Sequence, residues 1–253
     1  MDILHLLIVG LAAVAGGAVN ALAGGGTLIT FPVLTAVGVP MVAANITNTV
    51  ALCPGYLGAT FAQHKELRGQ ALRLWLILPV AVLGGVGGGI LLLYTDDQIF
   101  RKVVPYLIIM AVVLMAMQDK IRAWLMRRAG KADGASLHDA WVLLPLIPAA
   151  VYGGFFGAGV SIIVIAVLGL VMSDSIIRLN AIKQVVSFAI NTAAAIFFLF
   201  SGQVVWSAAL VMAVGAVTGG VLGGRLAGRV SQIMLRRIVI GIGSVVALIY
   251  LIR

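Results

Sequence analysis

Long apolar stretches separated by short polar breaks run through almost the whole chain, and this pattern restricts its possible folds more than any other feature. Hydrophobic residues make up 62% of the 253 residues, whereas charged residues make up only 10%. A soluble domain needs about a quarter of its residues charged to cover its surface. This chain cannot cover itself in that way, so its outer surface must face lipid. We therefore predict an all-α integral membrane protein that crosses the bilayer several times.

The polar breaks divide the chain into apolar segments of unequal length. A helix needs about 20 apolar residues to cross the bilayer, and the segments 27–43 and 159–172 are shorter than that. We expect these two to belong to broken or re-entrant helices, and whether they span fully stays open. The predicted segments are 3–23, 27–43, 45–62, 71–94, 99–118, 139–156, 159–172, 179–200, 204–224 and 234–252.

An internal repeat relates the two halves of the chain. The polar stretch 119–138 separates a first predicted transmembrane repeat, 1–118, from a second one, 139–253. Shared apolar composition explains some of the matches between them, but not the matching pair of basic residues. We predict two related repeats of about five membrane segments each. At an offset of 135 residues, the matches are Gly84-Gly85-Val86 with Gly219-Gly220-Val221, Gly88-Gly89 with Gly223-Gly224, Arg101-Lys102 with Arg236-Arg237, and Asn45 with Asn180.

The positions of lysine and arginine orient the two repeats. Cytoplasmic loops of membrane proteins carry an excess of these residues. The linker 119–138 is therefore predicted to be cytoplasmic, and the loop with Asp96 and Asp97 to be outside. In the second half the loop charges are exchanged, which predicts inverted topology with both termini outside. The predicted cytoplasmic residues are Lys65, Arg68, Arg73, Lys120, Arg122, Arg127, Arg128, Lys131, Arg225, Arg229, Arg236 and Arg237, and those outside are Arg101, Lys102 and Arg253.

Glycine-rich breaks precede both short segments, at Gly24-Gly25-Gly26 and at Gly157-Ala158-Gly159. Glycine lets the chain leave helical geometry and lets a ligand approach the backbone. A helix that begins after such a break presents free N–H groups and the positive end of its dipole, which together favour an anion. The alternative is that these glycines only allow close helix packing. We predict a packing role for the other glycine runs, 84–89 and 219–224, which lie inside long segments.

Two stretches carry a resemblance to a known family. The first is Ala23-Gly24-Gly25-Gly26-Thr27, followed by Pro32, Leu34 and Gly38, and the second is the Gly-x-Gly at 157–159. In these residues the chain resembles the TauE/SafE family of sulfite and organosulfonate exporters, and the resemblance covers nearly the whole sequence. It implies a small carrier of sulfur-containing anions in the bacterial inner (plasma) membrane. The second half lacks a triple glycine and a counterpart of Pro32, so the halves need not contribute equally to a site.

Few polar residues lie within the apolar segments, and several are candidates for binding a substrate. Asn45 and Asn180 occupy equivalent places in the repeat, and a polar residue inside a membrane usually faces a partner or a cavity. Lys183 lies about 7.5 Å inside its segment, where it either faces an anion or extends to the cytoplasmic surface. The predicted substrate-binding residues are Asn20, Gly24, Gly25, Gly26, Thr27, Asn45, Asn48, Thr49, Gly157, Gly159, Ser161, Asn180, Lys183 and Gln184.

All eight acidic residues lie in loops or at segment ends. Proton relays and many sodium sites use carboxylates inside the membrane, and none of the predicted segments contains one in its interior. Amides, hydroxyls, backbone N–H groups and one lysine suit an anion rather than a cation. These residues predict a transporter of small anions that works by alternating access, without a cofactor or a metal. The resemblance implies that it exports sulfite, sulfonates or related organic acids.

Two other classes of protein compete with a transporter. An integral membrane enzyme is not expected, because the sequence has no HExxH motif, P-loop or Cys–His arrangement, and Cys53 is its single cysteine. A membrane subunit that anchors or assembles a partner remains the alternative. The net charge of +9 is explained by cytoplasmic loops and indicates no nucleic-acid partner. The expected partners are a small anion and the lipid bilayer, and a homo-oligomer stays open.

Overall fold

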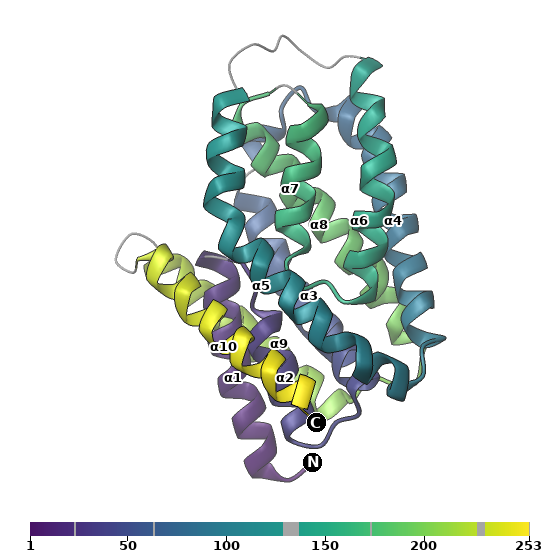
Figure 1. Ribbon diagram of the computed structural model, residues 1–253, viewed down its shortest axis with the longest axis vertical. Helices are drawn as coiled ribbons and strands as arrows, with labels where there is room; N and C mark the ends of the chain where they lie inside the picture. Colours follow the sequence, from purple (N-terminus) through teal and green to yellow (C-terminus); the bar gives the residue numbers. More distant parts are fainter. Residues whose placement is uncertain (23, 63, 129–136, 173, 227–230, 253) are drawn as a thin grey trace.

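Helices make up the fold throughout the part of the chain that the structure describes, and no strand occurs there. The computed structural model describes all residues except 23, 63, 129–136, 173, 227–230 and 253. Figure 1 shows the arrangement. The α-helices are α1 (Ile3–Leu22), α2 (Thr27–Ala36), α3 (Met41–Ala62), α4 (Ala71–Leu93), α5 (Asp97–Arg128), α6 (Leu143–Phe155), α7 (Val160–Val171), α8 (Ile176–Leu199), α9 (Trp206–Leu226) and α10 (Gln232–Ile252), with short 3-10 helices at η1 (His64–Leu67) and η2 (Leu137–Val142).

The lengths of the helices confirm a multi-pass membrane protein. Within the described residues, six helices are long and apolar enough to cross a membrane, namely α1, α4, α5, α8, α9 and α10. By contrast, α2 has 10 residues and α7 has 12, so each is about half as long as a spanning helix. The helix α5 continues to Arg128, and the predicted linker 119–138 therefore begins inside a helix.

Glycines let the helices pack closely in two places, between α1 and α9 and between α4 and α6. A side chain on Gly219 would overlap the carbonyl oxygen of Val14, and one on Gly88 would overlap that of Val151. Small residues serve this purpose where helices associate in lipid. The packing role predicted for the runs 84–89 and 219–224 is thus confirmed at these positions. Gly87 differs, because a side chain there would meet no atom within 4 Å.

Two helical hairpins, α1–α2 and α6–α7, pack against the longer helices. The short arm α2 contacts α10, and the short arm α7 contacts α5. At the centre, α3 packs against α8 and α9, and α5 packs against α10. Figure 1 places both chain termini at one end of the molecule and the last turns of α5 at the other. The helix α3 contacts both arms of the first hairpin, and α8 contacts both arms of the second.

A buried ion pair joins the start of α4 to the connection between α7 and α8. The Arg73 guanidinium donates to the Asp174 carboxylate, and the Gln70 amide donates to the same carboxylate over 3.1 Å. The side chains of Arg73 and Asp174 are only 2% and 10% exposed. Burial raises the pKa of Asp174, but hydrogen bonds from the Ser175 backbone and from those two side chains outweigh it, so this pKa lies below its ordinary value.

Candidate functional site

Both glycine-rich segments interrupt the helices, as their sequences predict. The first break separates α1 from α2, and its residues Gly24 and Gly25 have φ angles of +75° and +87°. The second break separates α6 from α7, and Gly157 and Gly159 have φ angles of +76° and +75°. Only glycine adopts this left-handed region without a steric penalty. The glycines therefore supply backbone turns, in addition to any packing role.

The two breaks lie close together in the interior. A Cβ atom built on Gly24 would lie 3.7 Å from the side-chain oxygen of Ser161, which belongs to the first turn of α7. The helix α5 contacts both breaks, because the Met115 side chain lies against Gly25 and the Ala111 Cα lies 3.6 Å from a Cβ built on Gly159. Since Ala111 and Met115 are one helical turn apart, the same face of α5 supports both breaks.

Free backbone donors gather at these breaks. Within the described residues, several N–H groups at the start of α2 and α7 donate no hydrogen bond. An N–H group at a helix start carries part of the positive end of the helix dipole. The breaks therefore offer donors and a positive potential from two helices at one place. The groups belong to Gly25, Gly26 and Thr27 at the first break and to Ala158, Gly159 and Ser161 at the second.

A cavity of about 960 Å³ reaches the breaks, and residues of α1, α3, α5, α7, α8 and α9 line it. Among the residues predicted to bind a substrate, those that line it are Asn20, Gly24, Ser161, Asn180, Lys183 and Gln184. Lys183 is half-buried and makes no hydrogen bond or ion pair within the part of the chain that the structure describes. A cation of the second half and a helix break of the first half thus face the same space.

Three polar residues of the cavity wall are not among the predicted site residues: Glu66, Gln118 and Arg122. Arg122 falls in the stretch 119–138, whose charge indicates a loop, but α5 continues through it. Gln118 is the last residue of its predicted segment. The spacing of Ala111, Met115, Gln118 and Arg122 at three- and four-residue steps places them on one helical face, and this was the sequence signal available for finding them.

The other predicted asparagines bind protein groups instead of lining this cavity. The Asn48 amide donates to the Thr27 hydroxyl over 3.4 Å and accepts from Thr30, which holds α3 against α2. Asn45 is completely buried, and its amide donates to the Phe155 carbonyl over 2.8 Å, which joins α3 to the end of α6. The Thr49 hydroxyl donates to the carbonyl of Asn45 over 2.9 Å, a bond within its own helix.

Four phenylalanine rings pack together next to the breaks. Phe31 of α2 lies 5.6 Å from Phe156 and 6.4 Å from Phe100 of α5, and Phe100 lies 5.6 Å from Phe155, measured between ring centroids. We call these four residues the aromatic cluster. Phe100 is one turn beyond Asp97 in α5. The cluster therefore extends from the second break to within one turn of Asp97.

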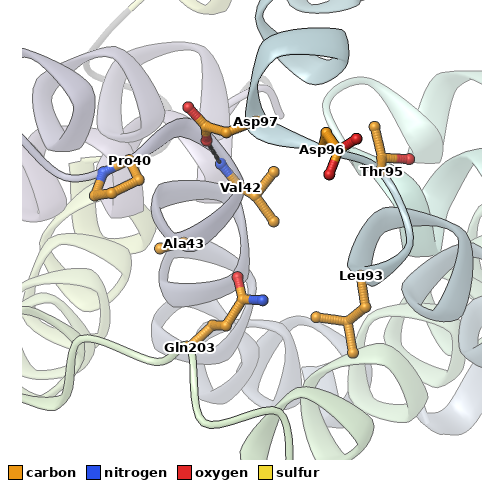
Figure 2. Close-up of a pocket in the computed structure, with 8 residues that line it drawn as sticks. All are labelled: Pro40, Val42, Ala43, Leu93, Thr95, Asp96, Asp97 and Gln203. Carbon is orange, nitrogen blue, oxygen red and sulfur yellow. Dashed lines mark hydrogen bonds between the residues drawn. The ribbon is translucent and has the colours of Figure 1, made fainter.

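A smaller cavity of about 330 Å³ lies where α3 and α5 begin, and Figure 2 shows it. Its wall includes Asp96, Asp97, Gln203 and the first turn of α3. In Figure 2 the Asp97 carboxylate points to the backbone of Val42, whose N–H donates to it over 3.0 Å. This carboxylate therefore caps the start of α3. The two cavities differ in charge, because the larger one contains cations and the smaller one contains two carboxylates.

Comparison with known proteins gives matches over nearly the whole chain. The profile of the family described as "Sulfite exporter TauE/SafE" matches residues 8–250. The "Probable membrane transporter protein" of Haemophilus influenzae is 28% identical over 202 residues, which cover 79% of this chain and 76% of that protein. No solved structure matches the chain.

Two further relatives have similar names. The "Probable membrane transporter protein YfcA" of Escherichia coli K12 is 24% identical over 241 residues, covering 93% of this chain and 85% of that protein. The "Probable membrane transporter protein ORF9" of a Sinorhizobium species is 26% identical over 219 residues, covering 83% and 79%. All three names describe membrane transporters, which confirms the prediction of a transporter over an enzyme. Because the family profile matches residues 8–250, which is nearly the whole chain, the chain belongs to the sulfite exporter TauE/SafE family of membrane transporters.

Proposed function

We propose that the chain carries small anions through the larger cavity and binds them at the two helix breaks. The observation that supports this most is the meeting of three features in one cavity: Gly24 of the first break, Ser161 of the second, and Lys183, which has no partner within the described part of the chain. Free N–H groups at helix starts favour anions. A lysine inside a membrane protein that faces a cavity is typical of a substrate path.

Sulfite, sulfonates and related organic acids are the proposed substrates. A sulfonate or sulfite group presents three oxygens, each of which can accept hydrogen bonds from several N–H groups at once. The cavity of about 960 Å³ leaves room for an organic group beside the anionic one. Membership of the family supports the same class, since its description names sulfite export.

We also propose that the two halves are inverted repeats, and the helix contacts support this. Exchanging α1–α5 with α6–α10 in order turns the contact of α1 with α9 into that of α6 with α4. The same exchange turns the contact of α2 with α10 into that of α7 with α5. The arms α2 and α7 would then be re-entrant, each returning to the end of the molecule from which its hairpin started. Such repeats with broken helices are common in secondary transporters.

The larger cavity would open to the cytoplasm and the smaller one to the outside of the bacterial inner membrane. The excess of lysine and arginine in the loops supports this orientation. The test uses single cysteines at positions 2 and 133, introduced into a Cys53→Ser background in intact cells. An impermeant thiol reagent should label position 2 directly and position 133 only after the membrane is opened. Direct labelling of position 133 would exclude this orientation.

Flux into and out of proteoliposomes that contain only this chain tests the function. The panel consists of sulfite, methanesulfonate, sulfate, acetate and succinate. Movement of one or more of these anions without chemical change supports the proposal. If thermal melting shows that the protein is folded and no anion of the panel moves, the result would favour a subunit that anchors a partner. Recovery of a chemically altered anion would indicate an enzyme.

A further inference from the structure

One face of α5 contributes a pair of polar residues to the larger cavity, and this pair is not part of either helix break. Gln118 and Arg122 are one helical turn apart, and both line the cavity. Arg122 is exposed to this space and forms no ion pair within the described residues. The neighbouring carboxylate of Asp119 is engaged by Arg236 instead. Arg122 therefore lines the cavity with no carboxylate bound directly to it among the described residues, although the charge of Asp119 still acts on it.

Gln118 adds a second unsatisfied group at the same place. Its side-chain oxygen is buried and has no hydrogen-bond partner among the residues that the structure describes. A buried acceptor without a partner costs free energy, and most such atoms in proteins find one. Arg122 follows Gln118 by four residues on this face of α5, and this i and i+4 spacing brings side chains together. Gln118 can therefore hold the guanidinium in place when an anion draws Arg122 into the cavity.

The place of this pair is distinct from that of the helix breaks. The Met115 side chain touches Gly25 at the first break, and Arg122 lies about 10 Å farther along α5. Lys183 lies about 12 Å along α8 from Asn191, whose side-chain oxygen is 3.5 Å from a Cβ built on Gly157 of the second break. The two cations thus lie on different helices of the cavity wall, each at some distance from the N–H groups.

The charge of the wall favours an anion near Arg122. Two cations, Arg122 and Lys183, line the cavity with only one carboxylate, Glu66, among the described lining residues. A cation inside a membrane protein is costly unless a counter-charge or water compensates it. The planar guanidinium can bind a sulfonate or carboxylate through two parallel hydrogen bonds.

We propose that Arg122, positioned by Gln118, forms a second anion-binding position for a sulfonate or carboxylate group, separate from the helix breaks. This proposal rests on the function proposed above. The group has two possible sources: the far end of one substrate with two anionic groups, or a second, separate anion. Both sources require the same chemistry at Arg122, and the experiment below distinguishes them.

The test measures binding to the purified full chain in detergent by isothermal titration calorimetry. The probes are ethanesulfonate and ethane-1,2-disulfonate, which differ only in the second sulfonate. The variants are Arg122→Gln, Gln118→Leu and Lys183→Gln. Arg127→Gln is the matched control, because Arg127 is an exposed arginine of the same helix that does not line the cavity.

Arg122→Gln should weaken binding of the disulfonate about 10- to 100-fold, the effect of losing a hydrogen bond between charged groups, and Gln118→Leu should weaken it less. Unchanged binding of ethanesulfonate would then identify one substrate with two ends. A fall in ethanesulfonate stoichiometry from two to one would identify two separate anions. If both probes bind Arg122→Gln as they bind Arg127→Gln, while Lys183→Gln weakens them, the second position is overturned and the proposed function stands. If no probe binds the wild-type chain, the proposed function itself fails for sulfonates.

Discussion

Replacing Lys183 tests the proposed site most directly, because this side chain has two opposed interpretations. It lies in α8, lines the larger cavity and has no partner within the described residues. If it binds the substrate, Lys183→Gln removes one hydrogen bond between charged groups, worth about 1.5–3 kcal/mol. Each 1.4 kcal/mol corresponds to about a tenfold change in affinity. The KM for internal anion should therefore rise about 10- to 100-fold.

The assay is sulfite efflux from proteoliposomes at a fixed membrane potential, with the internal concentration varied. Lys183→Arg should restore part of the affinity, because it keeps the charge but changes the shape of the donor. Arg178→Gln is the control, since Arg178 is an exposed residue of the same helix outside the cavity wall. An unchanged KM in Lys183→Gln, with melting temperature also unchanged, would refute the assignment. Lys183 would then only extend to the cytoplasmic surface.

Three further predictions concern the helix breaks, the Arg73–Asp174 ion pair and the lack of acidic residues inside the apolar segments of the sequence. Gly25→Ala should lower the melting temperature, because the alanine backbone would have to keep a φ near +87° and its methyl group would collide with Met115. Gly87→Ala should leave the melting temperature unchanged or raise it, because a Cβ atom there meets no atom within 4 Å. Asp174→Asn should destabilise the fold by about 3–5 kcal/mol, because the buried Arg73 would lose the carboxylate that balances its charge. The pKa of Asp174 is depressed, so its contribution in the wild type is present at neutral pH and is lost as the pH falls through this lowered pKa. The melting curves of wild type and variant should therefore converge only in acid. Efflux should follow the membrane potential and ignore a pH gradient, since about 2.3 kcal/mol per charge per 100 mV acts on an anion; efflux that follows the pH gradient alone would contradict this.

The sequence is sufficient to predict the helix breaks but not all of the cavity wall. Gly24 and Gly157 stand out because glycine after a long apolar run has few roles other than a turn or close packing. Arg122 is misplaced by sequence reasoning because a run of basic residues looks the same whether it forms a loop or the last turns of a long helix. The aromatic cluster has no signal either, since Phe31, Phe100 and Phe156 become neighbours only through tertiary packing.

If anions bind at the helix breaks as proposed, the position of the aromatic cluster would link this binding to a rearrangement of the rings. Phe31 lies in the first turns of α2, and Phe155 and Phe156 adjoin the second break, so the elements that carry the free N–H groups also carry these packed rings. Phe100 belongs to α5, which supports both breaks through Ala111 and Met115. Rings packed edge to face do not deform gradually, because a closely packed interior changes between discrete arrangements. Under the proposed function, a movement of either hairpin relative to α5 would therefore alter the donors around the anion and separate the rings in the same step, which is the coupling that alternating access would require.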